Sequence, residues 1–139
     1  GSCAACLHGM DLQPHDIDAM FDSSDVEAVR AQFADVIIEP IIGTDGWLTK
    51  EFGVLFDHCR IDMASDPQPS LAEPEPIDCG PTARGLLETV EWRGHGIRIP
   101  PLPLHLNANR RRGRDERVRQ IEQFLQDRAS VSRQAVEEQ

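Results

Sequence analysis

The pair Asp16-Ile17-Asp18, close behind a glycine-led helix, is the feature that most limits what this chain can fold into. Apolar residues within and after the pair suit a buried strand over residues 16–21. On a strand, the side chains of Asp16 and Asp18 leave the same face, roughly 6.5 Å apart along the chain. Carboxylate oxygens are hard ligands, so the pair predicts a site for a divalent cation.

A short helix precedes this strand. The spacing of small and apolar residues predicts it over residues 2–9, with Gly9 as its end. Backbone N–H groups at a helix start are unpaired and lie at the positive end of the helix dipole. Gly1 and Ser2 are therefore candidate phosphate ligands.

A third carboxylate follows in the run FGVLFDHCRIDMASD. This run predicts a hairpin with strands over residues 53–56 and 59–64 and a turn at Asp57-His58. Asp62 lies between two apolar residues of the second strand. It is the candidate third ligand.

Together, these elements resemble the core motif of the DNA polymerase β-like nucleotidyltransferase superfamily, and in particular its small bacterial and archaeal members. These include minimal nucleotidyltransferases and antibiotic or toxin–antitoxin nucleotidyltransferases. Members share a Gly-Ser or Gly-Gly pair, a short helix, an Asp-x-Asp strand and a third acid on a later strand. The resemblance covers roughly the first 65 residues. It implies an α/β (α+β) fold in which helices flank a mixed β-sheet.

The resemblance also implies an activity. A metal-dependent enzyme of this kind moves a nucleoside monophosphate, AMP from ATP or from another nucleoside triphosphate, to a hydroxyl of a small molecule or a protein. Asp16, Asp18 and Asp62 would be catalytic and would bind Mg²⁺ or Mn²⁺. The β- and γ-phosphates would lie at Gly1 and Ser2. Nucleic acid is a less favoured partner, and a homodimer is left open.

Each acid also has a plainer interpretation. Asp16 and Asp18 could cap local backbone in a turn. Asp62 could be an exposed strand residue paired with Arg60, with Asp57 as the fallback ligand. A wider alternative is a catalytically inactive protein of the same fold that binds a partner, as in a toxin–antitoxin pair.

Charge is spread unevenly along the chain. The 24 acidic residues outnumber the 14 basic ones, and the net charge of −10 argues against a non-specific nucleic-acid coat. Six arginines nevertheless fall within residues 109–119, against two acids. Such a cluster can bind phosphates bidentately, or it can simply line a solvated helix face. In chains that resemble this one, a terminal helix with this Arg-Gly-Arg-x-x-Arg lead-in packs by the active-site face, so Arg112, Arg114 or Arg117 is expected to approach the nucleotide, and Arg112 and Arg114 are the candidate ligands.

Length and composition predict one domain. A chain of 139 residues with 40% hydrophobic residues can build a single core, expected over residues 1–128, with a polar tail that frays over residues 129–139. The first residue is not methionine, and Gly-Ser is also a common cloning scar. In related proteins a helix and a strand precede this glycine, so the sheet is expected to lack both.

Four cysteines raise the question of disulfides or a second metal site. Nothing marks secretion and no apolar run is long enough to span a membrane, so the expected location is the cytoplasm, with reduced thiols and no membrane partner. Cys3-x-x-Cys6 with His8 could bind zinc, but a matching second pair is missing from the sequence. The cysteines are Cys3, Cys6, Cys59 and Cys79.

The rest of the chain predicts ordinary elements. Ser24-x-x-Glu27 reads as a capping box for a helix that runs to about residue 34. Pro40 limits the strand over residues 36–42 to an edge or a strand end. A proline-rich loop (Pro67, Pro69, Pro74, Pro76), a hairpin (87–92 and 97–99, around 94–96) and two helices (103–109 and 115–126) follow.

Overall fold

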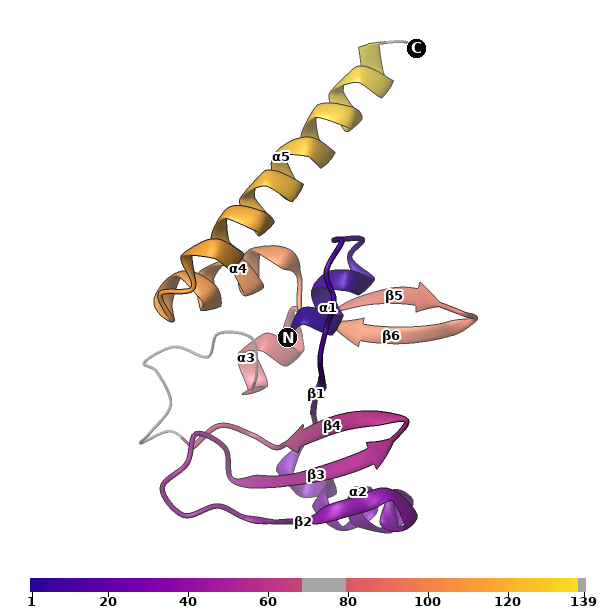
Figure 1. Ribbon diagram of the computed structural model, residues 1–139, viewed down its shortest axis with the longest axis vertical. Coiled ribbons are helices and arrows are strands. Elements are labelled where there is room, and N and C mark those ends of the chain that lie inside the picture. The colour runs from indigo at the N-terminus through magenta and orange to yellow at the C-terminus, as the bar shows by residue number, and fades with distance from the viewer. Residues whose placement is uncertain (69–79, 138–139) are drawn as a thin grey trace.

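The computed structural model describes residues 1–68 and 80–137. Within these ranges the chain forms a four-stranded sheet, a separate two-stranded sheet and several helices. In Figure 1, α2 lies against the larger sheet, whereas α1, α4 and α5 lie beyond the β1 edge of that sheet. The elements are α1 (Ser2–Leu7), β1 (Ile17–Met20), η1 (Ser23–Asp25), α2 (Val26–Gln32), η2 (Ala34–Val36), β2 (Ile37–Gly43), β3 (Glu51–Asp57), β4 (Cys59–Ala64), α3 (Gly80–Gly85), β5 (Glu88–Trp92), β6 (His95–Ile99), α4 (Leu102–Arg111) and α5 (Asp115–Glu137).

The four-stranded sheet has the order β1-β4-β3-β2. β1 pairs with β4 in parallel, whereas β4 with β3 and β3 with β2 are antiparallel, so the sheet is mixed. This confirms the predicted mixed sheet with flanking helices. It also confirms the hairpin that carries Asp62 and the edge position of the strand that contains Pro40.

Two apolar clusters hold the structure together. One lies between the sheet and α2 and is centred on Ile41, Leu55 and Met63. The other joins α1 to α4 and α5. Gly53 is required in the first cluster, because a Cβ atom there would lie 2.6 Å from Ile41 Cα. The second cluster consists of Ala5, Met10, Leu102 and Ile121, with Leu12, Leu106, Phe124 and Leu125 packed against them.

Several element ends differ from the prediction. The Ser24–Glu27 capping box is wrong: α2 has Asp25 at its N-cap with no side-chain cap hydrogen bond, and Asp22 caps the preceding η1, where its side chain accepts a hydrogen bond from Ser24 N at 3.0 Å. A 3₁₀ turn therefore precedes α2, which ends at Gln32. In the small hairpin the turn falls one residue earlier than predicted, because Arg93 and Gly94 adopt φ of 51° and 81° and leave His95 in β6.

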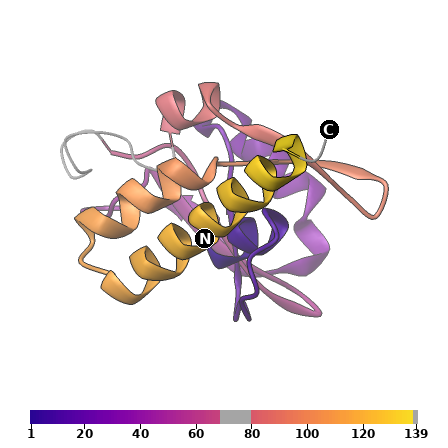
Figure 2. The same cartoon turned by 90° about the horizontal axis from the view of Figure 1, so that it is seen from above.

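The last helix is longer than predicted. α5 continues to Glu137 rather than ending near Gln126, so the segment expected to fray is helical as far as the structure describes it. No glycine or proline interrupts residues 115–137, which explains why the helix can continue without apolar spacing. Figures 1 and 2 show α4 and α5 side by side, with the end of α5 reaching away from the sheet.

Some predicted features fall on residues that the structure does not describe. Pro69, Pro74, Pro76 and Cys79 lie outside them. Among the helices that the structure describes, none combines the length and the apolar character needed to cross a bilayer.

Candidate metal centre

Three carboxylates converge at the β1 edge of the sheet. Each of Asp16, Asp18 and Asp62 offers one oxygen, and these oxygens all lie within 4.8 Å of one another. The parallel register of β1 and β4 explains this arrangement, because Asp18 pairs directly with Asp62. Asp16 directly precedes β1, two residues before Asp18, so it extends the same face. The structure thus brings together the three acids that the sequence proposed as ligands.

The predicted glycine lies against this group. A Cβ atom on Gly1 would overlap Asp18 Oδ2. The start of α1 therefore lies so close to the Asp18 carboxylate that only glycine fits there. Cys3 Sγ donates a hydrogen bond of 3.2 Å to Asp16 O and so joins α1 to the residue before β1. Gly1 and Ser2, proposed as phosphate ligands, are therefore at the edge of the carboxylate group.

Cys3 remains a thiol. Burial raises its pKa, and the neighbouring Cys6, Asp18 and Asp16 raise it further, although the N-terminal amino group acts in the opposite direction. Cys6 Sγ bonds Leu12 O at 3.2 Å.

The residues of the zinc alternative have other partners. His8 Nε2 lies 2.8 Å from Pro100 O, in hydrogen-bonding distance. In the described part of the chain, Cys3, Cys6 and His8 are not among the groups with metal-ligand geometry. The structure therefore gives the zinc alternative no support.

Asp62 also has the plainer partner that the sequence suggested. Arg60 Nε donates to Asp62 Oδ1 at 2.7 Å, and the two side chains are 47% and 22% exposed. An ion pair this exposed contributes at most about 1 kcal/mol. Because a carboxylate has two oxygens, the pair leaves Oδ2 available to a metal. The two interpretations of Asp62 are thus compatible.

A second group of charged residues links the segments that follow β1 and β4. Arg84 in α3 donates to Asp22 at 2.6 Å and to Asp66 at 2.7 Å. Asp66 also accepts a hydrogen bond of 3.3 Å from Ser23 N. The pKa of Asp22 lies below its usual value, chiefly because Ser24 N and then the Ser24 hydroxyl bond it, with Arg84 adding to the effect. Sequence reasoning missed this group, since its members are far apart in the chain and share no motif.

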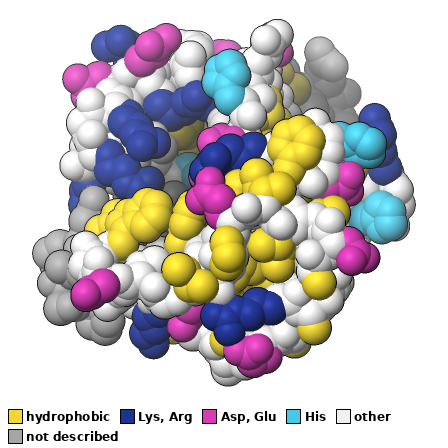
Figure 3. Space-filling model, turned by 60° about the horizontal axis from the view of Figure 1, so that its bottom comes forward, with side chains coloured by type: hydrophobic (Ala, Val, Ile, Leu, Met, Phe, Trp, Pro, Cys, Tyr) yellow, Lys and Arg dark blue, Asp and Glu magenta, His cyan; other side chains and the backbone are white. Residues whose placement is uncertain are grey.

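The arginines lie elsewhere on the molecule. Arg112 ends α4 and Arg114 lies in the turn to α5, and both side chains are exposed. Figure 3 shows Lys and Arg side chains gathered at the upper left of one face of the molecule, across a hollow from acidic side chains near the centre.

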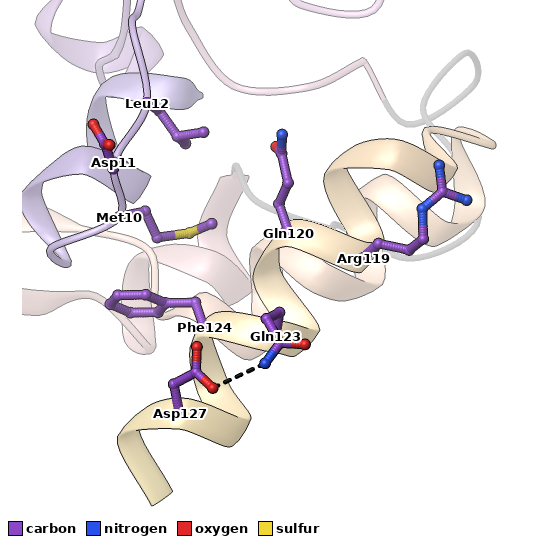
Figure 4. Close-up of a pocket in the computed structure, with 8 residues that line it drawn as sticks. All are labelled: Met10, Asp11, Leu12, Arg119, Gln120, Gln123, Phe124 and Asp127. Carbon is purple, nitrogen blue, oxygen red and sulfur yellow. Dashed lines mark hydrogen bonds between the residues drawn. The ribbon is translucent and has the colours of Figure 1, made fainter. Parts of the chain in front are cut away.

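Two depressions flank this region. The larger, about 480 Å³, is an open groove between α5 and the segment after α1, and none of the three acids lines it (Figure 4). Gln123 and Asp127 form a hydrogen bond of 2.8 Å at its rim. The smaller, about 190 Å³, lies directly beside Asp16 and is also lined by Cys3 and Cys59.

The donor set fits a hard divalent cation. Mg²⁺ and Mn²⁺ prefer oxygen ligands, and the group consists of carboxylates alone. On one Mg²⁺ with bonds of about 2.1 Å, two oxygens are about 3.0 Å apart when cis and about 4.2 Å apart when trans, so three oxygens within 4.8 Å of one another would move inward to bind one ion. The close approach of Gly1 to Asp18 keeps this space free of side chain.

Comparison with known proteins agrees with this architecture. No protein-family model matches the chain, and no curated protein is significantly similar to it in sequence. Among solved structures, a Thermotoga maritima protein provisionally described as a nucleotidyltransferase is similar, with a TM-score of 0.65 and 19% sequence identity. The match covers 91% of this chain and 80% of that one. The chain therefore has the nucleotidyltransferase fold.

Proposed function

We propose that this chain is a metal-dependent nucleotidyltransferase that moves a nucleoside monophosphate, AMP from ATP, to a hydroxyl. The observation that carries the proposal is the convergence of Asp16, Asp18 and Asp62 beside Gly1. Three acids gathered this closely repel one another, and a bound cation relieves the repulsion. The similarity in fold to a protein described as a nucleotidyltransferase supports the same activity.

The reaction forms a bond between the acceptor oxygen and the α-phosphorus. It breaks the bond from that phosphorus to the bridging oxygen, and pyrophosphate leaves with the electron pair. Bound Mg²⁺ would supply charge neutralisation on the phosphates and a lower pKa for the acceptor hydroxyl. A carboxylate oxygen of Asp62 takes the acceptor's proton. Asp18 lies in β1, and the Cys3 thiol donates a hydrogen bond to the Asp16 carbonyl just before it, so both carboxylates are held to orient the site.

Phosphates of the donor occupy the region between α1 and the arginines. Backbone N–H groups at Gly1 and Ser2 face the β- and γ-phosphates. Arg112 and Arg114 approach from the α4–α5 turn and add positive charge. The acceptor is a small molecule or a protein, because the chain carries a net charge of −10.

Calorimetric titration tests the proposal. ATP and the other nucleoside triphosphates are titrated with and without Mg²⁺ into the protein, into Asp16→Asn and into Asp35→Asn. Asp35 is the matched control, an exposed acid in η2 outside the carboxylate group. We expect binding that requires Mg²⁺, that Asp16→Asn abolishes and that Asp35→Asn preserves. Binding that ignores both the metal and Asp16 would sink the proposal.

A further inference from the structure

Two thiols in α1 hold the segment that leads to the carboxylate group. Cys3 Sγ donates a hydrogen bond of 3.2 Å to Asp16 O. Cys6 Sγ donates one of 3.2 Å to Leu12 O. Residues 11–16 form neither helix nor strand, so regular structure does not fix this segment. Because Asp16 is also one of the three converging acids, the two thiols bear on the position of a proposed metal ligand.

The spacing of the two cysteines suits a disulfide. Residues three apart in a helix share a face, and their Cα atoms are about 5 Å apart. This separation lies within the range of about 4.4–6.8 Å that disulfides span, but the Cβ atoms must approach one another by about 1–2 Å. The hydrogen bond that opens α1, from Ala5 N to Gly1 O, is long at 3.4 Å. The first turn is therefore loosely held and can make this adjustment.

Cys6 is a better partner for Cys3 than Cys59 is. Cys59, in β4, lines the same depression of about 190 Å³ as Cys3. Cys6, however, is the thiol that acts on the pKa of Cys3, and such an influence falls with distance. Both cysteines of α1 are partly exposed, so a small oxidant can reach them.

We propose that Cys3 and Cys6 form a reversible disulfide that releases Asp16 and thereby lowers the affinity of the carboxylate group for a divalent cation. The inference rests on the proposed function and adds control by oxidation to its metal site. The oxidant is a low-molecular-weight disulfide, such as oxidised glutathione. One cysteine sulfur bonds to a sulfur of the oxidant, whose other sulfur leaves as a thiol with the electron pair of the broken bond. The second cysteine sulfur then displaces the remaining glutathione, and the two cysteine protons go to the two departing thiols.

Oxidation removes both hydrogen bonds at once. Neither sulfur of a disulfide carries a proton, so Asp16 O and Leu12 O lose their thiol donors. Loss of a group that orients a metal ligand typically lowers metal affinity by about 10–100-fold. Reduction restores both donors, so the change in affinity is reversible.

The test measures Mn²⁺ affinity by electron paramagnetic resonance before and after treatment with excess oxidised glutathione. Cys6→Ser and Cys3→Ser each remove one member of the pair and keep a hydroxyl that can donate a hydrogen bond. The double variant Cys59→Ser/Cys79→Ser is the matched control, because it keeps the pair and removes the other thiols of the chain. Ion-exchange chromatography removes chains that carry a glutathione adduct, mass spectrometry of proteolytic peptides identifies the disulfide, and thermal melting verifies folding.

We expect oxidation to lower Mn²⁺ affinity by about tenfold or more in the wild-type chain and in the double variant, and dithiothreitol to restore it. In Cys6→Ser and Cys3→Ser, the affinity after oxidation should stay within about twofold of the value for the same variant when reduced. Peptide masses should show the Cys3–Cys6 disulfide in the wild-type chain and in the double variant.

Three results would overturn the inference and leave the proposed function intact. The first is a wild-type chain in which oxidised glutathione forms no Cys3–Cys6 disulfide. The second is a disulfide that changes Mn²⁺ affinity by less than about twofold. The third is an equal response in Cys6→Ser, which would assign the effect to Cys3 and Cys59. If the reduced wild-type chain fails to bind Mn²⁺ at all, the proposed function falls and its control by oxidation falls with it, whereas the disulfide is still measured by mass.

Discussion

The sheet and the α4–α5 hairpin hold their charged groups in different ways. In the sheet, backbone pairing fixes Asp18 opposite Asp62, and Gly1 presses against Asp18. In the helical hairpin, Arg112 and Arg114 stand exposed at a turn. A metal needs ligands placed within a few tenths of an ångström, whereas attraction of a phosphate acts over about 10 Å. The difference teaches that the proposed metal site depends on sheet register, whereas the proposed attraction of phosphate depends on side chains that need no fixed position.

The largest expected effect breaks the sheet itself. Leu55 is 1% exposed in the cluster between the sheet and α2, so Leu55→Ala should cost about 2–5 kcal/mol of unfolding free energy through lost burial and a cavity. Because β3 pairs with β4, Mn²⁺ affinity should fall as well. Urea unfolding and electron paramagnetic resonance of Mn²⁺ measure the two quantities.

A matched change in the exposed part of α5 is the control. Val131 is 65% exposed, and Val131→Ala should alter stability by less than about 0.5 kcal/mol and leave Mn²⁺ affinity unchanged. Equal costs for the two substitutions would contradict the contrast between a packed sheet and a solvated helix end.

Removal of one proposed metal ligand is the next effect in size. Asp62→Asn keeps the shape of the side chain but removes a charge, and Mn²⁺ affinity should fall by about 10–100-fold or more. Stability should change by less than about 1 kcal/mol, because the lost pair with Arg60 is exposed and repulsion from Asp18 is relieved. Asp35→Asn should leave both quantities unchanged. A large loss of stability with intact metal binding would make Asp62 a structural residue.

The contrast also explains what the sequence could reveal. Asp16, Asp18 and Asp62 were predictable because strand spacing is local, and an acid between two apolar residues is conspicuous. Arg84, which ties together the ends of β1 and β4, was not, because it meets Asp22 across 62 residues of chain. The capping error has the same kind of cause, since Asp22, Ser23 and Ser24 can all cap and tertiary contacts selected Asp22.

The helical half was harder to predict for a different reason. The end of α5 was placed near Gln126 because apolar spacing stops there, yet helix formation needs only residues that tolerate it. The arginines were recognised as a cluster from composition, but the place of the α4–α5 turn in the fold follows from how α4 and α5 pack on α1. Patterns of spacing carry no information about such packing.

Arg114→Ala tests the contribution of the exposed arginines at the α4–α5 turn. Arg114 is exposed, and a single exposed arginine near a phosphate contributes about 1 kcal/mol, so affinity for the Mg²⁺–ATP complex should fall about fivefold. The loss should shrink as salt rises, because screening weakens long-range attraction. Mn²⁺ affinity without nucleotide should not change. Calorimetry at two salt concentrations measures the affinity for the Mg²⁺–ATP complex. A loss of affinity that does not depend on salt would indicate a fixed contact instead.

The smallest effect concerns the end of α5. Residues 129–131, 133 and 134 are exposed, so the described side chains that truncation after Arg128 removes bury little apolar surface. Arg128 itself, which lies 5.7 Å from the Phe124 ring centre, is retained. Unfolding free energy should change by less than about 0.5 kcal/mol, and nucleotide affinity should persist. Thermal melting and calorimetry on the full and the shortened chain test this. A loss above about 2 kcal/mol would mean that the folding unit extends past residue 128 and that the helical half depends on its last turns as the sheet depends on Leu55.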